Sequence, residues 1–170
     1  ISWLMPMAHF SMRFPKTTAL RTIESPLWQG SFAPGGGQVV RNLPRAWRAV
    51  FERSFGARFE HVSVVAGPET DERLAAAGAL AQAVDGATLL LTSQFLSLPP
   101  AVQLWLLGHE LSHTVQLSRE GSDAEVALES EAWDAASSAI HGQRYAITGR
   151  GSAPLSAAAF VLDRMAVHYF

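Results

Sequence analysis

The sequence predicts a small α+β domain in which a short sheet with a hairpin packs against a helical layer. The composition, with 48% apolar and 16% charged residues in a chain of 170, is typical of a globular protein with one core. Between residues 43 and 142 we expect the order helix, strand, helix, hairpin, helix, helix, which favours an α+β arrangement. No apolar run reaches the roughly 18 to 20 residues that a membrane helix needs, so we expect a soluble protein without a membrane span.

The N-terminal segment, residues 1–42, is expected to be an irregular arm. Prolines and a glycine run punctuate it, and aromatic residues are scattered through it. These prolines and glycines are Pro6, Pro15, Pro26, Pro34, Gly35, Gly36 and Gly37. Because exposed aromatic side chains favour interfaces, we expect the arm to pack on the domain or on a partner.

The predicted domain, residues 43–142, begins with a helix and a strand. Apolar residues recur at spacings of three and four from Leu43 to Phe55, which predicts a helix, and Gly56 is expected to end it. The run from His61 to Ala66 is rich in β-branched residues and predicts a short strand, ended by Gly67-Pro68.

A second helix and a hairpin are expected next. Thr70 to Ala77 predicts a helix with Thr70 as its N-cap, because acidic residues occupy its first turn. Two strand-like runs follow, over residues 80–84 and 87–92. They are joined by Asp85-Gly86, a dipeptide typical of a two-residue hairpin turn.

Two long helices complete the predicted domain. Two prolines open the first, over residues 99–119, because proline suits the first helical turn. The second is expected over residues 123–140, with Gly142 after its end. The last segment, residues 143–170, is expected to be a linker followed by a short apolar helix over residues 155–167.

The first long helix contains the motif His109-Glu110-Leu111-Ser112-His113, a match to H-E-x-x-H. Histidines four residues apart lie on one helical face, so both imidazoles can bind a single Zn²⁺, while Glu110 lies about 100° round the helix, within reach of a water on the metal. Zinc lowers the pKa of that water, and the glutamate accepts its proton as general base. The alternative is a helix whose histidines and glutamate are ordinary surface or core-edge residues.

A third ligand is expected from the following helix, because the chain has no cysteine and a metal must use histidine and carboxylate. The acids of that helix are Glu125, Glu129, Glu131 and Asp134, and its apolar stripe is read as Val126, Trp133, Ala136 and Ile140. Glu129 falls on the inward side, between Val126 and Trp133, and is preferred. Glu131 is the alternate third ligand and is expected to be more solvated. A helix salt bridge is the alternative role for Glu129.

A donor that stabilises the transition state is expected in a hydrolase of this kind. His141 and Tyr145 are candidates because both can donate a hydrogen bond and both follow the metal-binding helices. The alternative for each is a structural role.

Over residues 43–136 the chain resembles the core domain family of extracellular contractile injection systems. The resemblance rests on the leading Leu-Pro helix, the short strand with Gly67-Pro68, the hairpin with Gly86, and the segment from Leu106 to Gln116 around H-E-x-x-H. The segment Leu128-Glu129-Ser130-Glu131-Ala132 is similar to the Leu-Glu-x-Glu-Ala segment of the family. Related zincins place their third ligand at the first Glu of a Glu-x-x-Ala pattern, which is Glu129 here.

The resemblance implies a short zincin-like fold and a metallopeptidase that accompanies toxins or effectors of a bacterial injection system. It also implies a bacterial cytoplasmic location with export by that system, and particle proteins as partners. The chain departs from the family pattern at Trp133, where an aspartate usually supports the metal site, and at Leu117, where a second glutamine often follows.

These observations favour a zinc-dependent metalloendopeptidase that acts on a protein or peptide substrate. The ligands would be His109, His113 and Glu129, and Glu110 would activate water. Two alternatives stay open: a docking or cargo module of an injection particle that keeps a metal site, and a self-processing domain. Nucleic acid is disfavoured as a partner, because the formal charge is −2.

Overall fold

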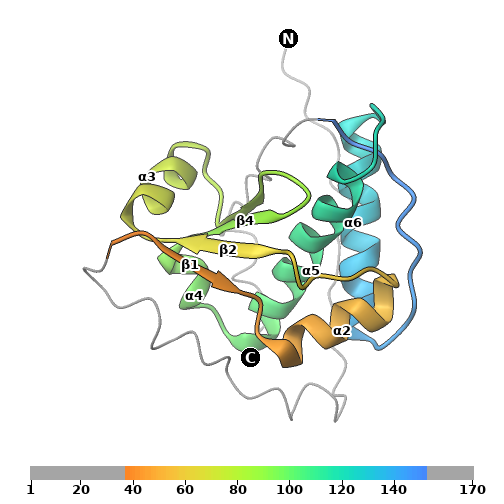
Figure 1. Cartoon of the computed structure of the whole chain (residues 1–170), viewed down its shortest axis with the longest axis horizontal. Coiled ribbons are helices and arrows are strands. Elements are labelled where there is room, and N and C mark those ends of the chain that lie inside the picture. The colour runs from red at the N-terminus through yellow and green to blue at the C-terminus, as the bar shows by residue number, and fades with distance from the viewer. Residues whose placement is uncertain (1–36, 153–170) are drawn as a thin grey trace, which may run out of the picture.

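The computed structural model describes residues 37–152, which form an α+β fold with a mixed sheet of four strands and five helices (Figure 1). This confirms the fold class predicted from the sequence. The elements are β1 (Val39–Asn42), α2 (Arg45–Phe55), β2 (Ser63–Ala66), α3 (Pro68–Ala76), β3 (Ala81–Ala83), β4 (Thr88–Leu91), α4 (Ser93–Leu96), α5 (Pro100–Leu117) and α6 (Glu125–Ile140). The predicted C-terminal helix and most of the predicted arm lie outside the described residues.

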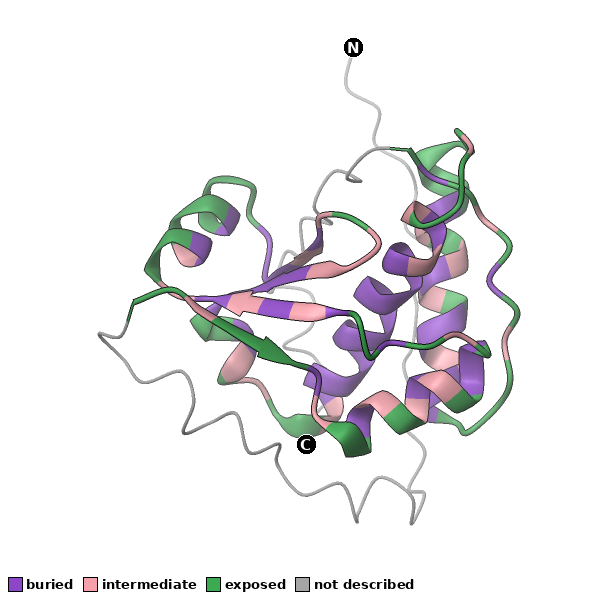
Figure 2. Ribbon diagram, viewed as in Figure 1, coloured by how far each residue is buried: buried purple, intermediate pink, exposed green. Residues whose placement is uncertain are grey.

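The sheet has the strand order β1-β2-β4-β3. The two central strands, β2 and β4, run parallel, with Val64 opposite Leu89, and each outer strand pairs antiparallel with its neighbour. Strand β3 is at the edge of the sheet and packs beside α5. The core therefore forms where the sheet meets the helices α2, α5 and α6 (Figure 2).

Strand β1 was not predicted by the sequence pattern. It pairs with β2 from Val39 opposite Ala66 to Asn42 opposite Ser63. Most of its residues are exposed, including Val40, so the strand carries no alternation of buried and exposed positions that a sequence pattern could register. The ordered sheet thus begins within the segment that the sequence assigned to the arm.

The hairpin between β3 and β4 is confirmed, but its predicted two-residue turn is wrong. The amide of Val84 donates to the carbonyl of Thr88, which leaves a three-residue connection. Asp85 stabilises this connection by accepting from the amide of Ala87 at 2.8 Å. Gly86 leaves room for Ser118, the first residue after α5. A Cβ on residue 86 would lie only 3.1 Å from the Cβ of Ser118.

The predicted N-cap role of Thr70 is also wrong, because α3 begins two residues earlier, at Pro68. Proline suits this first helical position, and Gly67 before it has a φ of 145°. Thr70 is buried, and its hydroxyl accepts a hydrogen bond from Gln38 at 2.7 Å. The threonine therefore ties α3 to the residue that precedes β1.

Helix α5 is the centre of the fold, because it is buried on nearly all sides. A Cβ on Gly108 would lie 2.8 Å from the ring of Phe51 in α2 and 3.3 Å from Ala136 in α6. The glycine thus permits close packing of both helices. Most side chains on the buried face of α6 are small. This face consists of Leu128, Ala132, Ala135, Ala136, Ala139 and Ile140. Close packing of α5 and α6 brings the candidate metal ligands together.

The predicted apolar stripe of α6 needs one correction. Val126, which was assigned to the inward face, is 68% exposed. The buried face instead passes through Leu128 and Ala132, so its centre is rotated relative to the predicted stripe. Among the described residues, no helix is both long and apolar enough to cross a membrane.

Candidate metal centre

The two histidines of the motif lie one turn apart on α5 and point at a common centre. Both are buried, with His109 at 1% and His113 at 3% exposure. Their Nε2 atoms are 3.0 Å apart, and their rings are nearly perpendicular, at 89°. Helical spacing of four residues produces this approach, as the sequence predicted.

Glu129 on α6 reaches both histidines. Its Oε2 atom is 3.3 Å from the Nε2 atom of His109, and its Oε1 atom is 3.0 Å from the Nε2 atom of His113. In the part of the chain that the structure describes, these three form the group of histidine and acidic side chains whose ligand atoms lie within 4.8 Å of one another. Ligand atoms of a tetrahedral zinc are about 3.3 Å apart, so this donor set fits a metal ion.

Gln116 fixes the orientation of the His113 ring. Its amide nitrogen donates to the carbonyl of Leu128 at 3.0 Å and to Oε2 of Glu131 at 2.8 Å. Its amide oxygen therefore faces His113, whose Nδ1 atom donates to it at 2.7 Å. With one proton held on Nδ1, the Nε2 atom is left to bind either a second proton or a metal ion.

The charges at the centre are coupled. Burial raises the pKa of the Glu129 carboxyl, but hydrogen bonds and charge interactions with His109 and His113 outweigh burial and lower this pKa to about 2. Burial lowers the pKa of His113, but the hydrogen bond with Glu129 and the charges of Glu110 and Glu129 outweigh it, so that the pKa is raised. A negative carboxylate thus faces a histidine that holds its proton, and a cation can replace that proton.

Glu110 is buried at 8% exposure and is held by the sheet. Its Oε2 atom accepts a hydrogen bond from the backbone amide of Ala83 in β3 at 2.8 Å. Its charge acts on His113, but its oxygens do not belong to the group of ligand atoms formed by the histidines and Glu129. The edge strand therefore positions the residue that the sequence nominated as general base.

The alternate ligand, Glu131, has a different set of contacts. Its Oε1 atom accepts from the amide and the hydroxyl of Thr148, and its Oε2 atom accepts from the amide of Gly149 and from Gln116. Burial raises the pKa of Glu131, but these hydrogen bonds outweigh it and lower the pKa. Glu131 thus binds the segment after α6 and reaches His113 only through Gln116.

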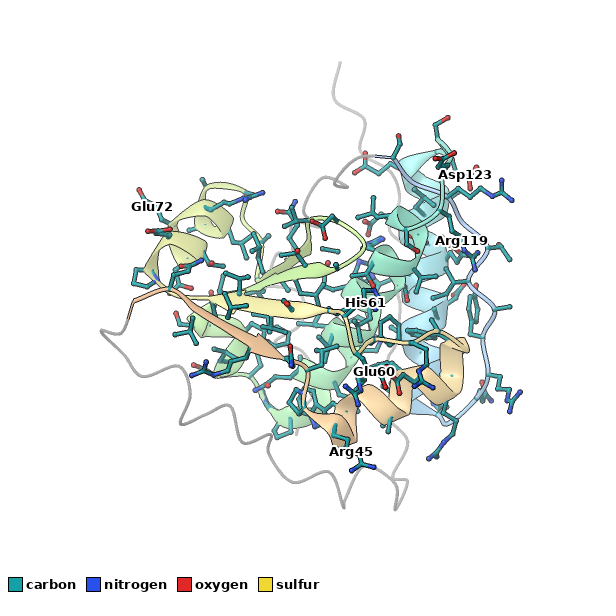
Figure 3. All side chains as sticks on the ribbon, in the orientation of Figure 1. Arg45, Glu60, His61, Glu72, Arg119 and Asp123 are labelled. Carbon is teal, nitrogen blue, oxygen red and sulfur yellow. The ribbon has the colours of Figure 1, made fainter. Side chains whose placement is uncertain are left out.

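This segment after α6 forms a strap over the two long helices, which we define as residues 147–151. The carbonyl of Ile147 accepts a hydrogen bond from Arg119, and Gly151 donates to the carbonyl of Gln116 at 3.0 Å. Asp123 and Arg150 are joined by two hydrogen bonds, of 2.8 and 2.9 Å. Arg119 and Asp123 lie at the same end of the α5–α6 pair (Figure 3). No sequence pattern indicated the strap, because most of its contacts use the backbone amides and carbonyls of its residues.

The two candidates for transition-state stabilisation do not belong to the group of converging ligand atoms. His141 follows the last turn of α6, 12 residues or about 18 Å along the helix from Glu129, and its Nδ1 atom bonds to the carbonyl of Ser137 at 2.6 Å. Tyr145 donates its amide to the carbonyl of Ser54 in α2, and burial with the charges of Asp134 and Glu131 raises its pKa. His141 thus lies at the far end of α6, whereas the Tyr145 side chain is near enough to Asp134 and Glu131, in the middle of α6, for their charges to act on it.

The fold and the site thus define an α+β domain with a candidate His/His/Glu metal centre. Residues 42–121 match the family model of the eCIS core domain, the family that the sequence resembles. The match covers α5 with its H-E-x-x-H motif and ends before α6, which carries Glu129. The match supports the resemblance to this family and suggests an association with an injection system. No curated protein and no solved structure matches the chain.

Proposed function

We propose that this protein is a zinc-dependent metallopeptidase with a short zincin-like fold, associated with a bacterial contractile injection system. The observation that carries the proposal is the convergence of two histidine nitrogens and a carboxylate within 3.0–3.3 Å of one another. Histidine and carboxylate accept several divalent ions, and the order of metal affinities favours zinc over most of them.

His109, His113 and Glu129 would hold the ion, through Nε2 of each histidine and the carboxylate. A bound zinc supplies a Lewis acid that polarises a carbonyl group and lowers the pKa of water to about 7. The Oε2 atom of Glu110 is engaged by the amide of Ala83, so Oε1 would take the proton from the attacking water. Glu110 would then pass this proton to the leaving amine of the cleaved peptide.

Metal content measured on the purified chain tests the ligand set. We expect about one zinc per chain in the wild-type protein, and loss of the metal in H113A and in E129Q. The matched control is D134N, because Asp134 is an exposed acid of the same helix with no part in the ligand group. A wild-type protein that takes up no zinc when zinc is supplied would overturn the proposed site.

Peptide cleavage needs a separate test. The zinc-loaded protein is incubated with a peptide library of broad composition, and cleavage is followed by mass spectrometry. We expect cleavage by the wild-type protein and none by E110Q, which keeps all three ligands. Cleavage by E110Q at the wild-type rate would contradict the assignment of Glu110.

A docking module of an injection particle is the second candidate. The observation that favours it is the family match itself, which ends at residue 121 and so does not include the third ligand. In this case the domain would bind proteins of the injection particle, and H113A and E129Q would still associate with them. Loss of that association in both metal-free variants would count against this candidate.

A further inference from the structure

The two histidine ligands are supported in different ways. The ring of His113 is oriented by a hydrogen bond from Nδ1 to Gln116. The Nδ1 atom of His109 is buried and has no hydrogen-bond partner among the described residues. A metal-binding histidine almost always donates its second ring N–H to a carboxylate, a carbonyl or a water. Among the described residues, the contacts that orient the ring of His109 are therefore ones other than a hydrogen bond to Nδ1.

One such contact is an aromatic stack. The ring centroid of Trp133 lies 3.6 Å from that of His109, with an interplanar angle of 32°. Trp133 also stacks on Trp105, at 4.3 Å and 28°. Trp105 and His109 are one turn apart on α5, and Trp133 comes from α6, so an α6 ring contacts two successive rings of α5.

We infer that Trp133 is a positioning residue, which fixes the orientation of the His109 ring by stacking in place of a hydrogen bond to Nδ1. The inference extends the proposed function, because it assigns a residue that supports the proposed metal site. It also accounts for the departure noted in the sequence, where Trp133 stands at the position of a supporting aspartate.

Two geometric facts support this role. Trp133 follows Glu129 by one turn of α6, so the residue that would bind the metal and the residue that stacks on His109 share one helical face. Trp105 backs Trp133 from the same helix that carries His109, which limits the movement of the indole. The stack of Trp133 on His109 and the approach of Glu129 to the histidines therefore depend on the same packing of α5 against α6, which Gly108 permits.

A stacked indole suits a histidine that gains positive character. The face of an indole ring carries negative potential, and it attracts a cation held above it. The His109 ring gains such character when Nε2 binds a proton or a metal ion. Trp133 is thus suited both to orient the ring and to stabilise it when it binds a cation.

The test uses the full chain with W133L, which keeps an apolar side chain but removes the aromatic ring, and W133F, which keeps a smaller aromatic ring. In the metal-free protein, proton NMR of the histidine rings reports stacking directly, because an indole face shifts the signals of a ring placed above it. We expect the His109 signals to be shifted upfield in the wild type, and to return toward ordinary values in W133L. The signals of His141, which is exposed and follows the end of α6, serve as the internal control and are expected to change little.

Zinc affinity is the second readout. Loss of a contact that supports a metal ligand typically costs about 10- to 100-fold in metal affinity, so we expect a loss of this size in W133L and a smaller loss in W133F. Thermal unfolding of the metal-free variants shows whether each one folds. If W133L does not fold, W133F still provides the test.

The outcomes separate the two proposals. His109 signals that are the same in the wild type and in both variants would overturn the stacking inference, whether or not zinc binds. Wild-type zinc affinity in a folded W133L would overturn the role of the stack in metal binding. A wild type that shows the upfield shift but binds no zinc would overturn the proposed metal site and leave Trp133 as the residue that orients His109.

Discussion

The Oε1 atom of Gln116 lies 2.7 Å from the Nδ1 atom of His113, one turn earlier on the same helix. The amide nitrogen of the glutamine is bound to α6 through Leu128 and Glu131. This one side chain therefore sets the tautomer of a candidate ligand and connects it to the second helix of the site.

Replacing Gln116 with leucine should weaken both the site and the fold. Gln116 is completely buried, so Q116L leaves the buried Nδ1 atom of His113 without its acceptor, which costs about 1–3 kcal/mol of unfolding free energy. Loss of the support to His113 should lower zinc affinity by about 10- to 100-fold. Urea unfolding and chelator competition measure the two effects. The comparison variant is E131Q, which keeps the bond between Gln116 and His113; equal zinc affinities in E131Q and Q116L would contradict this assignment.

Substitution of Glu110 by glutamine should separate metal binding from catalysis. The amide oxygen of the new side chain can still accept from Ala83, so E110Q is expected to fold like the wild type and to bind zinc with similar affinity. Loss of the general base should lower the rate of peptide cleavage by about 10²- to 10⁴-fold. Zinc content and cleavage rate are measured on the same preparation, and zinc lost together with activity would mean that Glu110 acts on the metal site itself.

The metal-free protein should gain the most stability from its His113–Glu129 pair in mildly acidic solution. The pKa of Glu129 is lowered from 4.5 to about 2, so its contribution is present above pH 4.5 and is lost as the pH falls toward 2. The pKa of His113 is raised from 6.5, so its contribution is complete below pH 6.5 and is lost as the pH rises through the folded-state value. The stabilisation by the pair is therefore largest between pH 4.5 and 6.5.

Urea midpoints of the metal-free wild type and of E129Q, measured across this pH range, check the prediction. The difference between the two midpoints should shrink on both sides of the range. A difference that stays constant from about pH 3 to pH 8 would show that the pair is not charged in the folded state.

An alanine at Gly108 should destabilise the fold. Its Cβ would lie 2.8 Å from the ring of Phe51, and overpacking of a core typically costs about 1–3 kcal/mol. Because the clash would also separate α6 from α5, zinc affinity should fall in G108A as well. Thermal unfolding and chelator competition test this, with G37A as the control, since a Cβ on Gly37 meets nothing within 4 Å. Equal stability of G108A and G37A would contradict the account of helix packing.

The sequence predicted the parts of the site that depend on local geometry. The approach of His109 to His113 follows from helical spacing alone, and the preference for Glu129 over Glu131 agrees with the contacts of both residues. The burial of individual α6 residues was harder to predict, and Val126 is exposed where the pattern placed it on the inward face. The rotation of α6 about its axis depends on how its side chains pack against those of α5.

The remaining features depend on contacts between distant segments. The strap binds Glu131 mainly through backbone amides, and every residue except proline has such an amide, so residue type carries no signal for this contact. The support of His109 by Trp133 was also missed, because a tryptophan in place of an expected aspartate indicated a loss. Strand β1 lacks a buried face that would have marked it in the sequence.

The strap also carries the packed part of this protein beyond the segment that matches the family. A fragment that stops at residue 121, where the family match stops, would keep both histidines but lack Glu129, Trp133 and the amides that hold Glu131. A fragment that ran on through α6 but stopped before Thr148 would still lose the partners of Glu131. The segment that matches the family is therefore shorter than the packed unit, whose contacts with α5 continue to Gly151.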